Sequence, residues 1–299
     1  MTESTFINKN ENFSWNFLNY PIYTISERPK QVEKDIAILL IHGFGASTDH
    51  WRFNIPVLSS EFEVHAIDLL GFGKSPKPND VQYSGSLWKD QVIAYVKERI
   101  KKPTIVVGNS LGGYAALAAG AELKELSAGV ILLNAAGYFS EEKLVKKNML
   151  QTSIETVAGI FLKNIVLQRL IFENMRKPST IKKTLNQVYI NKKNVDDYLV
   201  NSIRKPSLDI GAFNVFRSVF NPSGPQGEPL DELFSKLSSP LLLLWGSKDP
   251  WMNTPKKRGL YEKYTPKNTT EVILDAGHCP HDEVPELVNQ KILDWIKTL

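Results

Sequence analysis

Short apolar runs divide most of this chain into regular units. The runs are nearly continuous rather than alternating, which is typical of strands buried on both faces of a parallel sheet. Helical patterns separate several of the runs, at residues 86–100, 110–123 and 286–299. This alternation predicts an α/β fold with a doubly wound, mostly parallel sheet, and we expect residues 19–27 to add an antiparallel edge strand. The expected buried strands are residues 36–41, 64–67, 104–108, 130–133, 241–245 and 272–274.

The alternation stops after Leu133 and resumes at Leu241. The intervening residues 138–222 have helical patterns and no strong strand pattern. Residues 138–221 contain fourteen Lys/Arg and seven Asp/Glu, a net charge of +7, whereas the whole chain carries +4. The pattern and the charge together predict that residues 138–222 are a helical insertion, within a core domain formed by residues 1–137 and 223–299.

Bulk composition excludes several classes of protein. One cysteine in 299 residues rules out an intramolecular disulfide,. The N-terminal residues have no signal-peptide pattern, and no apolar run approaches the roughly 18 residues of a membrane span. The small net charge gives no reason to expect a nucleic-acid partner. We expect a cytoplasmic protein, whose basic insertion is either a solvated face or a surface for peripheral contact with anionic membrane lipid.

The segment VVGNSLGG (106–113) carries the strongest chemical signal. It places the pattern G-x-S-x-G between a predicted strand and an Ala-rich helix, which is the context of a serine nucleophile on a sharp turn. Small neighbours are needed at such a turn, and Gly108 and Gly112 supply them. Ser110 would also lie at a helix N-terminus, where developing negative charge is favoured. The pattern predicts Ser110 as a nucleophile, and the alternative is a Gly-rich turn used only for packing.

A serine hydroxyl needs a base, and the base needs an acid that holds it. In this topology the order along the chain is Ser, acid, His. Asp249 follows the strand predicted at 241–245, and His278 follows the next predicted strand, 29 residues further on. We expect both beside Ser110 at the carboxyl edge of the sheet. Asp249 could instead be only a turn residue before Pro250.

The segment IHGFG (41–45) follows the first predicted buried strand. Its backbone is suited to an oxyanion hole, with the N–H of Phe44 and the N–H of Leu111 as the predicted donors. We expect His42 to bond this loop rather than to act as a base.

The stretch DAGHCPHDE (275–283) permits a second interpretation, because His278 and His281 have a spacing suited to metal ligands. However, Cys279 is followed by a proline, and no other His/Cys cluster supplies a fourth ligand. We therefore expect no metal and no organic cofactor. Cys279 is predicted to be a small neighbour of the base, and His281, Asp282 and Glu283 to shape the loop and the start of the last helix.

Taken together, these motifs resemble the α/β-hydrolase superfamily. The matching segments are HGFGAS (42–47), DLLGFGKS (68–75), GNSLGG (108–113), GSKDPW (246–251) and GHCPHDE (277–283). The resemblance implies that the helical insertion is a cap domain, and that Ser110 excludes the subgroups with an aspartate nucleophile. The run GHCPHDEVPE is also similar to hydrolases of plants and cyanobacteria that remove phytol from chlorophyll or pheophytin.

The resemblance implies a serine hydrolase that cleaves a carboxylic ester by way of an acyl-enzyme. The insertion is apolar over residues 157–172, which either packs the cap onto the core or contacts a lipophilic substrate. Three aromatic residues near its end are candidates for the substrate pocket: Phe213, Phe216 and Phe220.

Two alternatives remain. One is a C–C bond hydrolase of ring-cleavage products, with Arg217 as its cap arginine, although such enzymes usually carry Trp where this chain has Cys279. The other is a non-catalytic ligand-binding homologue.

Overall fold

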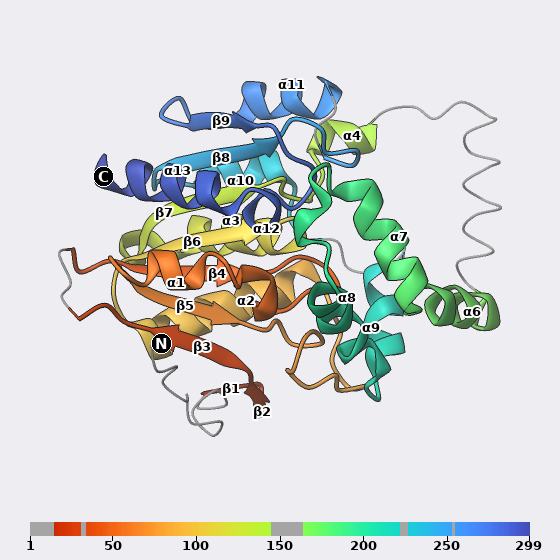
Figure 1. Cartoon of the computed structure of the whole chain (residues 1–299). Helices are drawn as coiled ribbons and strands as arrows, with labels where there is room; N and C mark the ends of the chain where they lie inside the picture. Colours follow the sequence, from red (N-terminus) through yellow and green to blue (C-terminus); the bar gives the residue numbers. More distant parts are fainter. Residues whose placement is uncertain (1–14, 31–33, 145–163, 222–226, 253–254) are drawn as a thin grey trace, which may run out of the picture.

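The computed structural model describes residues 15–30, 34–144, 164–221, 227–252 and 255–299. A seven-stranded sheet in the order β3-β5-β4-β6-β7-β8-β9 runs through its middle (Figure 1). Edge strand β3 is antiparallel to β5, and all the other neighbours are parallel. The strands are β3 (Thr24–Glu27), β4 (Ala37–Ile41), β5 (Glu63–Ile67), β6 (Thr104–Asn109), β7 (Ser127–Leu133), β8 (Leu241–Gly246) and β9 (Thr270–Leu274). The predicted fold class and strand positions are confirmed.

The central strands β4, β5, β6 and β8 are buried at every residue. That explains the nearly continuous apolar sequence of β4 and β8, because helices cover both faces of the sheet,. In β5 the two buried polar side chains, Glu63 and His65, bond each other (2.8 Å). The edge strand β9 is different, since only Leu274 in it is buried. The expectation of a buried strand at 272–274 is therefore wrong, because β9 lies at the edge of the sheet with a single neighbour, β8.

Residues 19–27 form two strands rather than one. Only β3 joins the large sheet, while β2 (Tyr20–Ile22) pairs with β1 (Trp15–Phe17) in a separate hairpin. The two residues between them, Leu18 and Asn19, both have positive φ (50° and 64°). Two consecutive residues in this conformation form the tight turn that suits the twist of a hairpin.

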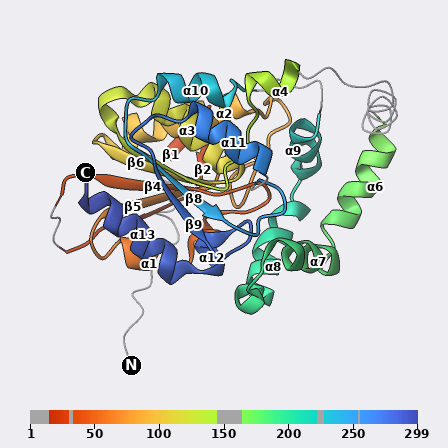
Figure 2. The ribbon, with the colours of Figure 1, turned by 90° about the horizontal axis from the view of Figure 1, so that it is seen from above.

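Two apolar cores lie on opposite faces of the sheet. The view from above shows the helices that cover each face (Figure 2). On one face α1 and α13 pack through residues such as Leu58 and Ile292. On the other face lie α2, α3, α10 and α11, with the Ala-rich α3 almost wholly buried. The helices are α1 (Ile55–Leu58), α2 (Gly85–Tyr95), α3 (Leu111–Leu123), α10 (Leu230–Lys236), α11 (Pro255–Tyr264), α12 (Pro280–Glu283) and α13 (Pro285–Lys297), with a π-helical extension of α2 at Val96–Ile100 and short 3₁₀ turns at Thr48–Trp51 and Lys124–Leu126.

Between β7 and β8, the described residues form helices and no strand. Helices α6 to α9 gather beyond the carboxyl ends of the strands, next to α12 (Figure 1). This is the region predicted as a cap, and the boundary at residues 138–222 stays a prediction. Its elements are α4 (Ser140–Leu144), α6 (Ile165–Met175), α7 (Pro178–Val188), α8 (Asp197–Arg204) and α9 (Ala212–Val219), with 3₁₀ turns at Lys192–Asn194 and Pro206–Leu208.

None of the helices in the described ranges is long and apolar enough to cross a membrane.

Candidate active site

Ser110 lies at the sharp turn between β6 and α3. Its backbone has φ 53° and ψ −119°, a conformation that a residue with a side chain rarely adopts,. Backbone hydrogen bonds hold it there: the Ser110 N–H donates to the Leu133 carbonyl (3.0 Å), and the Ala136 N–H donates to the Ser110 carbonyl (2.9 Å). The surrounding structure therefore imposes the strained turn, which is the arrangement expected of a functional serine.

Two glycines make this turn sterically possible. A Cβ on Gly108 would lie 2.2 Å from the Gly112 carbonyl oxygen, and a Cβ on Gly112 would lie 2.4 Å from the Ile41 carbonyl oxygen. Both distances are far below van der Waals contact. The pattern G-x-S-x-G is thus explained by the close approach of the backbones of β6, α3 and β4.

Asp249 and His278 form a buried pair at the carboxyl ends of β8 and β9. The Asp249 Oδ2 atom lies 2.8 Å from His278 Nδ1, and the side chains are 0% and 5% exposed. A carboxylate only accepts hydrogen bonds, so Nδ1 carries the proton and Nε2 of the neutral ring is free of one. The other carboxylate oxygen, Oδ1, accepts from the N–H groups of Trp251 (2.7 Å) and Met252 (3.2 Å). Asp249 is therefore fixed in orientation.

The ring of Trp251 lies against the imidazole of His278. Their centroids are 4.8 Å apart, with the planes inclined at 62°. Trp251 is itself half exposed, whereas His278 is buried.

Two buried asparagines, which sequence reasoning did not assign to the site, connect Ser110 with His278. The Asn109 Nδ2 atom donates to the carbonyl of His278 (2.9 Å) and to that of Leu133 (3.1 Å). The Asn134 side chain donates to the carbonyls of Gly277 (2.9 Å) and His278 (3.1 Å) and accepts from the Gly246 N–H (3.1 Å). Their position in the sequence could have identified them, because Asn109 ends one buried apolar strand and Asn134 follows another. A side-chain amide buried at such a place is expected to form hydrogen bonds.

The predicted oxyanion loop lies next to Ser110. A Cβ on Gly43 would approach the Ser110 Cβ to 3.3 Å, so the loop backbone passes directly beside the serine. Leu111 is the first residue of α3, where an N–H has no acceptor within the helix,. Within the described ranges the Phe44 N–H has no backbone carbonyl as a partner. Both predicted donors are therefore placed near the serine.

His42 holds the loop together. It is fully buried, and its Nε2 atom accepts from the Leu69 N–H (3.0 Å) while Nδ1 bonds the Gly43 carbonyl (2.8 Å). Burial lowers the pKa of this imidazole. The side chain acts as a neutral structural link, as expected.

The side chains that suggested a metal site, His278, Cys279 and His281, each contact a different set of residues. His278 bonds Asp249, the Cys279 thiol lies 4.0 Å from Asn109 Oδ1, and His281 packs between Trp51 and His50. Burial lowers the pKa of His281 well below its usual value and raises that of the Cys279 thiol. Within the part of the chain that the structure describes, no group of three or more His, Cys, Asp or Glu residues is arranged to hold a metal.

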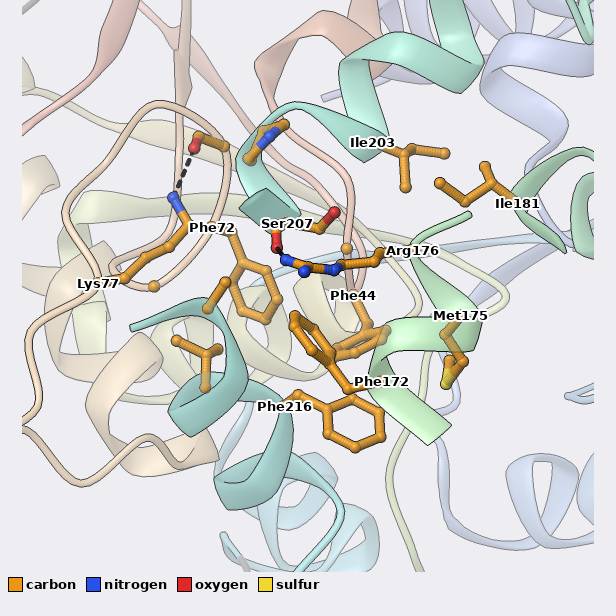
Figure 3. Close-up of a pocket in the computed structure, with 16 residues that line it drawn as sticks. Phe44, Phe72, Lys77, Phe172, Met175, Arg176, Ile181, Ile203, Ser207 and Phe216 are labelled. Carbon is orange, nitrogen blue, oxygen red and sulfur yellow. Dashed lines mark hydrogen bonds between the residues drawn. The ribbon is translucent and has the colours of Figure 1, made fainter. Parts of the chain in front are cut away.

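An apolar cavity of about 110 Å³ opens beside the predicted oxyanion loop. Figure 3 shows the rings of Phe44, Phe72, Phe172 and Phe216 gathered at it. Helices α6 and α9 supply Phe172 and Phe216, so the cavity lies between the core loops and the helices that follow β7. Its other lining residues include Met175, Arg176, Ile181, Ile203 and Val215.

The three phenylalanines predicted for the substrate pocket occupy different places. Phe216 lines the cavity. Phe220 packs against Phe216 and Phe44, with ring centroids 4.8 Å and 5.2 Å away, and lines a second cavity that reaches Leu111. Phe213 packs against Phe172, with ring centroids 5.6 Å apart and the planes tilted at 45°, and does not line the first cavity.

The apolar segment at 157–172 is only partly described, since residues 157–163 lie outside the described ranges. In α6, Phe172 is buried, but Ile165, Val166 and Leu170 are more than half exposed. These three side chains do not pack onto the core in the described structure.

A family model for the alpha/beta hydrolase fold matches residues 36–285. This chain belongs to that family. The match covers the five motifs found in the sequence, so the resemblance inferred from the sequence is confirmed.

Among similar proteins, the chloroplastic pheophytinase of Arabidopsis thaliana is 30% identical over 88% of this chain, and the match spans 61% of that longer protein. Lipase 3 of a Moraxella species is 26% identical over 81% of this chain and 71% of its own length. A crystal structure of a bacterial membrane phospholipase A is 27% identical and superposes with a TM-score of 0.72, covering 94% of this chain and 85% of that one. These relatives support a hydrolase.

Proposed function

We propose that this hydrolase cleaves carboxylic esters with a serine nucleophile. The proposal rests on one observation, the buried pair formed by Asp249 and His278. The buried amides of Asn109 and Asn134 hold this pair beside the strained turn at Ser110. Such a pair activates a serine for attack on a carbonyl carbon.

The reaction would proceed in two steps. His278 Nε2 accepts the proton of the Ser110 hydroxyl while its oxygen attacks the ester carbonyl, and the N–H groups of Phe44 and Leu111 bind the oxyanion. His278 then gives the proton to the departing alcohol, which leaves an acyl-enzyme. In the second step His278 takes a proton from water as the hydroxide attacks the acyl group. His278 then gives that proton to the departing Ser110 oxygen, which releases the acid and restores the free serine. Asp249 stabilises the imidazolium in both steps.

A fluorophosphonate probe tests this assignment. We expect one probe molecule to attach per chain, and peptide mass spectrometry to find it on Ser110, because the activated hydroxyl attacks the probe phosphorus as it would a carbonyl. Failure to label, or labelling of another residue, would favour a non-catalytic binding protein or a different centre.

The apolar cavity supports a lipophilic substrate. Its lining is mainly aromatic and aliphatic, and the polar side chains in it, Lys77, Arg176 and Ser207, already bond groups of the protein,. The similar proteins named as a pheophytinase and a lipase agree with this substrate class.

We therefore expect kcat/KM to rise with acyl chain length in a series of p-nitrophenyl esters. Each buried methylene contributes about 0.8 kcal/mol, roughly fourfold, until the cavity is filled. Replacing Phe216 with tryptophan should shorten the preferred chain, since the larger ring would occupy part of the cavity. A strict preference for acetate in the wild-type protein would contradict a lipophilic substrate.

The C–C hydrolase alternative finds less support. Arg217 donates through Nε to Gln168 Oε1 (2.8 Å) and lies over the ring of Phe213. It does not line the apolar cavity beside Phe44. Ester cleavage is accordingly the function that we propose.

We also propose that the helices that follow β7 contact a membrane surface. Side chains Ile165, Val166 and Leu170 of α6 are exposed and apolar. The neighbouring helices and turns carry exposed lysines at positions 177, 182, 183, 192, 193 and 205. Exposed apolar and basic side chains together suit an anionic lipid surface, and a similar structure is that of a membrane phospholipase A.

Vesicle sedimentation tests this contact. We expect the protein to pellet with vesicles containing phosphatidylserine at low salt and to be released at high salt, because basic side chains near the lipid surface are screened by ions. Vesicles of pure phosphatidylcholine are the control. No pelleting with anionic vesicles at any salt concentration would rule the contact out.

A further inference from the structure

Glu283 is a buried carboxylate that accepts hydrogen bonds from two segments far apart in the sequence. Its side chain belongs to α12 and is 2% exposed. Oε2 accepts from the N–H of Gly277, one residue before the proposed catalytic base, at 2.8 Å. Oε1 accepts from the N–H groups of Ile190 (3.0 Å) and Asn191 (2.7 Å), which follow α7. One side chain thus joins the loop of His278 to the chain that leaves α7.

The same two segments also touch through their backbones. The His278 N–H donates to the carbonyl of Val188, the last residue of α7, at 2.8 Å. A Cβ on Gly277 would lie 1.9 Å from that carbonyl oxygen, so a residue with a side chain could not take this place. The backbone that carries the imidazole therefore rests directly on the end of α7.

The neighbouring carboxylate, Asp282, strengthens this contact from the other side. The hydroxyl of Tyr189 donates to Oδ2 (3.0 Å), and Arg52 Nε donates to Oδ1 (3.0 Å). Arg52 also bonds the Asp196 carboxylate (2.8 Å) and the Asn194 carbonyl (2.8 Å). Residues 188–196 are in this way held onto the segment 277–283 at several points along their length.

We propose that Glu283 is a positioning residue, which sets the location of the His278 imidazole by tying the 277–278 backbone to residues 188–191. The role of His278 in this inference rests on the proposed function. The connection between the two segments does not depend on it. Asp249 fixes the rotation of the imidazole, and Asn109 and Asn134 hold the His278 carbonyl from the core side. Glu283 restrains the Gly277–His278 backbone from the opposite side, where it bonds residues 190 and 191 after α7.

The first test compares Glu283→Gln with Glu286→Gln. Glutamine has the size of glutamate but only one acceptor oxygen, and its NH₂ group would face an N–H donor of one segment, so one side of the connection is lost. We expect kcat for an ester to fall about 10- to 100-fold with KM changed less than about threefold, as for displacement of a catalytic group within an intact pocket. Glu286 lies exposed in the first turn of α13, and its variant should match the wild type.

Hydrogen–deuterium exchange measures the connection without any substrate. In Glu283→Gln, peptides covering at least one of the segments 188–191 and 275–279 should exchange faster than in the wild type and in Glu286→Gln. Glu283→Asp is a second variant, in case glutamine impairs folding: it keeps both oxygens but is one methylene shorter, so it should also lose one of the two segments.

The outcomes separate the two proposals. Unchanged exchange in both segments, or faster exchange with unchanged kcat, would overturn the positioning role of Glu283. If the wild type is not labelled at Ser110 by the fluorophosphonate, the proposed function fails, and the exchange data alone then decide whether Glu283 connects the segments.

Discussion

Replacing Ser110 with alanine should lower kcat/KM for an ester about 10⁴- to 10⁶-fold and abolish labelling by a fluorophosphonate. The variant lacks the hydroxyl that would form the acyl-enzyme, so only binding and oxyanion stabilisation of direct water attack remain. Stopped assays with a p-nitrophenyl ester, together with intact-mass analysis after probe treatment, measure both effects.

A control variant separates loss of chemistry from loss of folding. Ser247→Ala changes an exposed serine at the carboxyl end of β8 and should leave turnover and labelling unchanged. Thermal melting of Ser110→Ala should stay close to that of the wild type, because alanine needs the same strained φ and adds no atoms. Retained turnover in Ser110→Ala would place the nucleophile elsewhere.

Replacing His278 with alanine should have a comparable effect, and Asp249→Asn should lower kcat about 10⁴-fold. In the second variant the asparagine NH₂ group can face His278, which favours the imidazole tautomer with its proton on Nε2, so that Nε2 no longer accepts from Ser110. The Trp251 and Met252 N–H groups bond the Oδ1 side and would hold the amide oxygen there. Measurement of kcat at neutral pH tests both variants.

His281→Ala is the matched control for the histidines of this stretch. Its ring packs 4.2 Å from Trp51 and is wholly buried, so we expect a loss of about 1–3 kcal/mol in the free energy of unfolding,. Much of the turnover should remain in the folded protein. A loss of turnover as large as in His278→Ala would contradict the division of roles between the two histidines.

Much of the fold was predictable because its signals are local. Strands such as β4 and β8 are buried on both faces, which demands continuous apolar sequence whatever their neighbours are,. The hairpin at Leu18 and Asn19 was missed because the segment 19–27 is apolar enough for one long strand. A hairpin turn in which two non-glycine residues adopt positive φ gives only a weak signal in the sequence.

Within the candidate site, the sequence indicated the residues that a chemical motif marks, Ser110, Asp249 and His278. It did not indicate how they are held. Asn109 and Glu283 lie within matched motifs and Asn134 lies in none, but what each of them holds is defined by the carbonyl and N–H groups around it. Those groups come from segments as much as 169 residues apart, and only folding brings them together.

Sequence by itself determined the doubly wound sheet, the strained serine turn and the order of the proposed nucleophile, acid and base, because each depends on neighbours along the chain. Tertiary structure decided what lies against His278 and which aromatic rings form the cavity. Phe216 lines it while Phe213 does not, although both lie on α9. That difference depends on which face of α9 meets the core loops and α6, and packing between separate elements settles it.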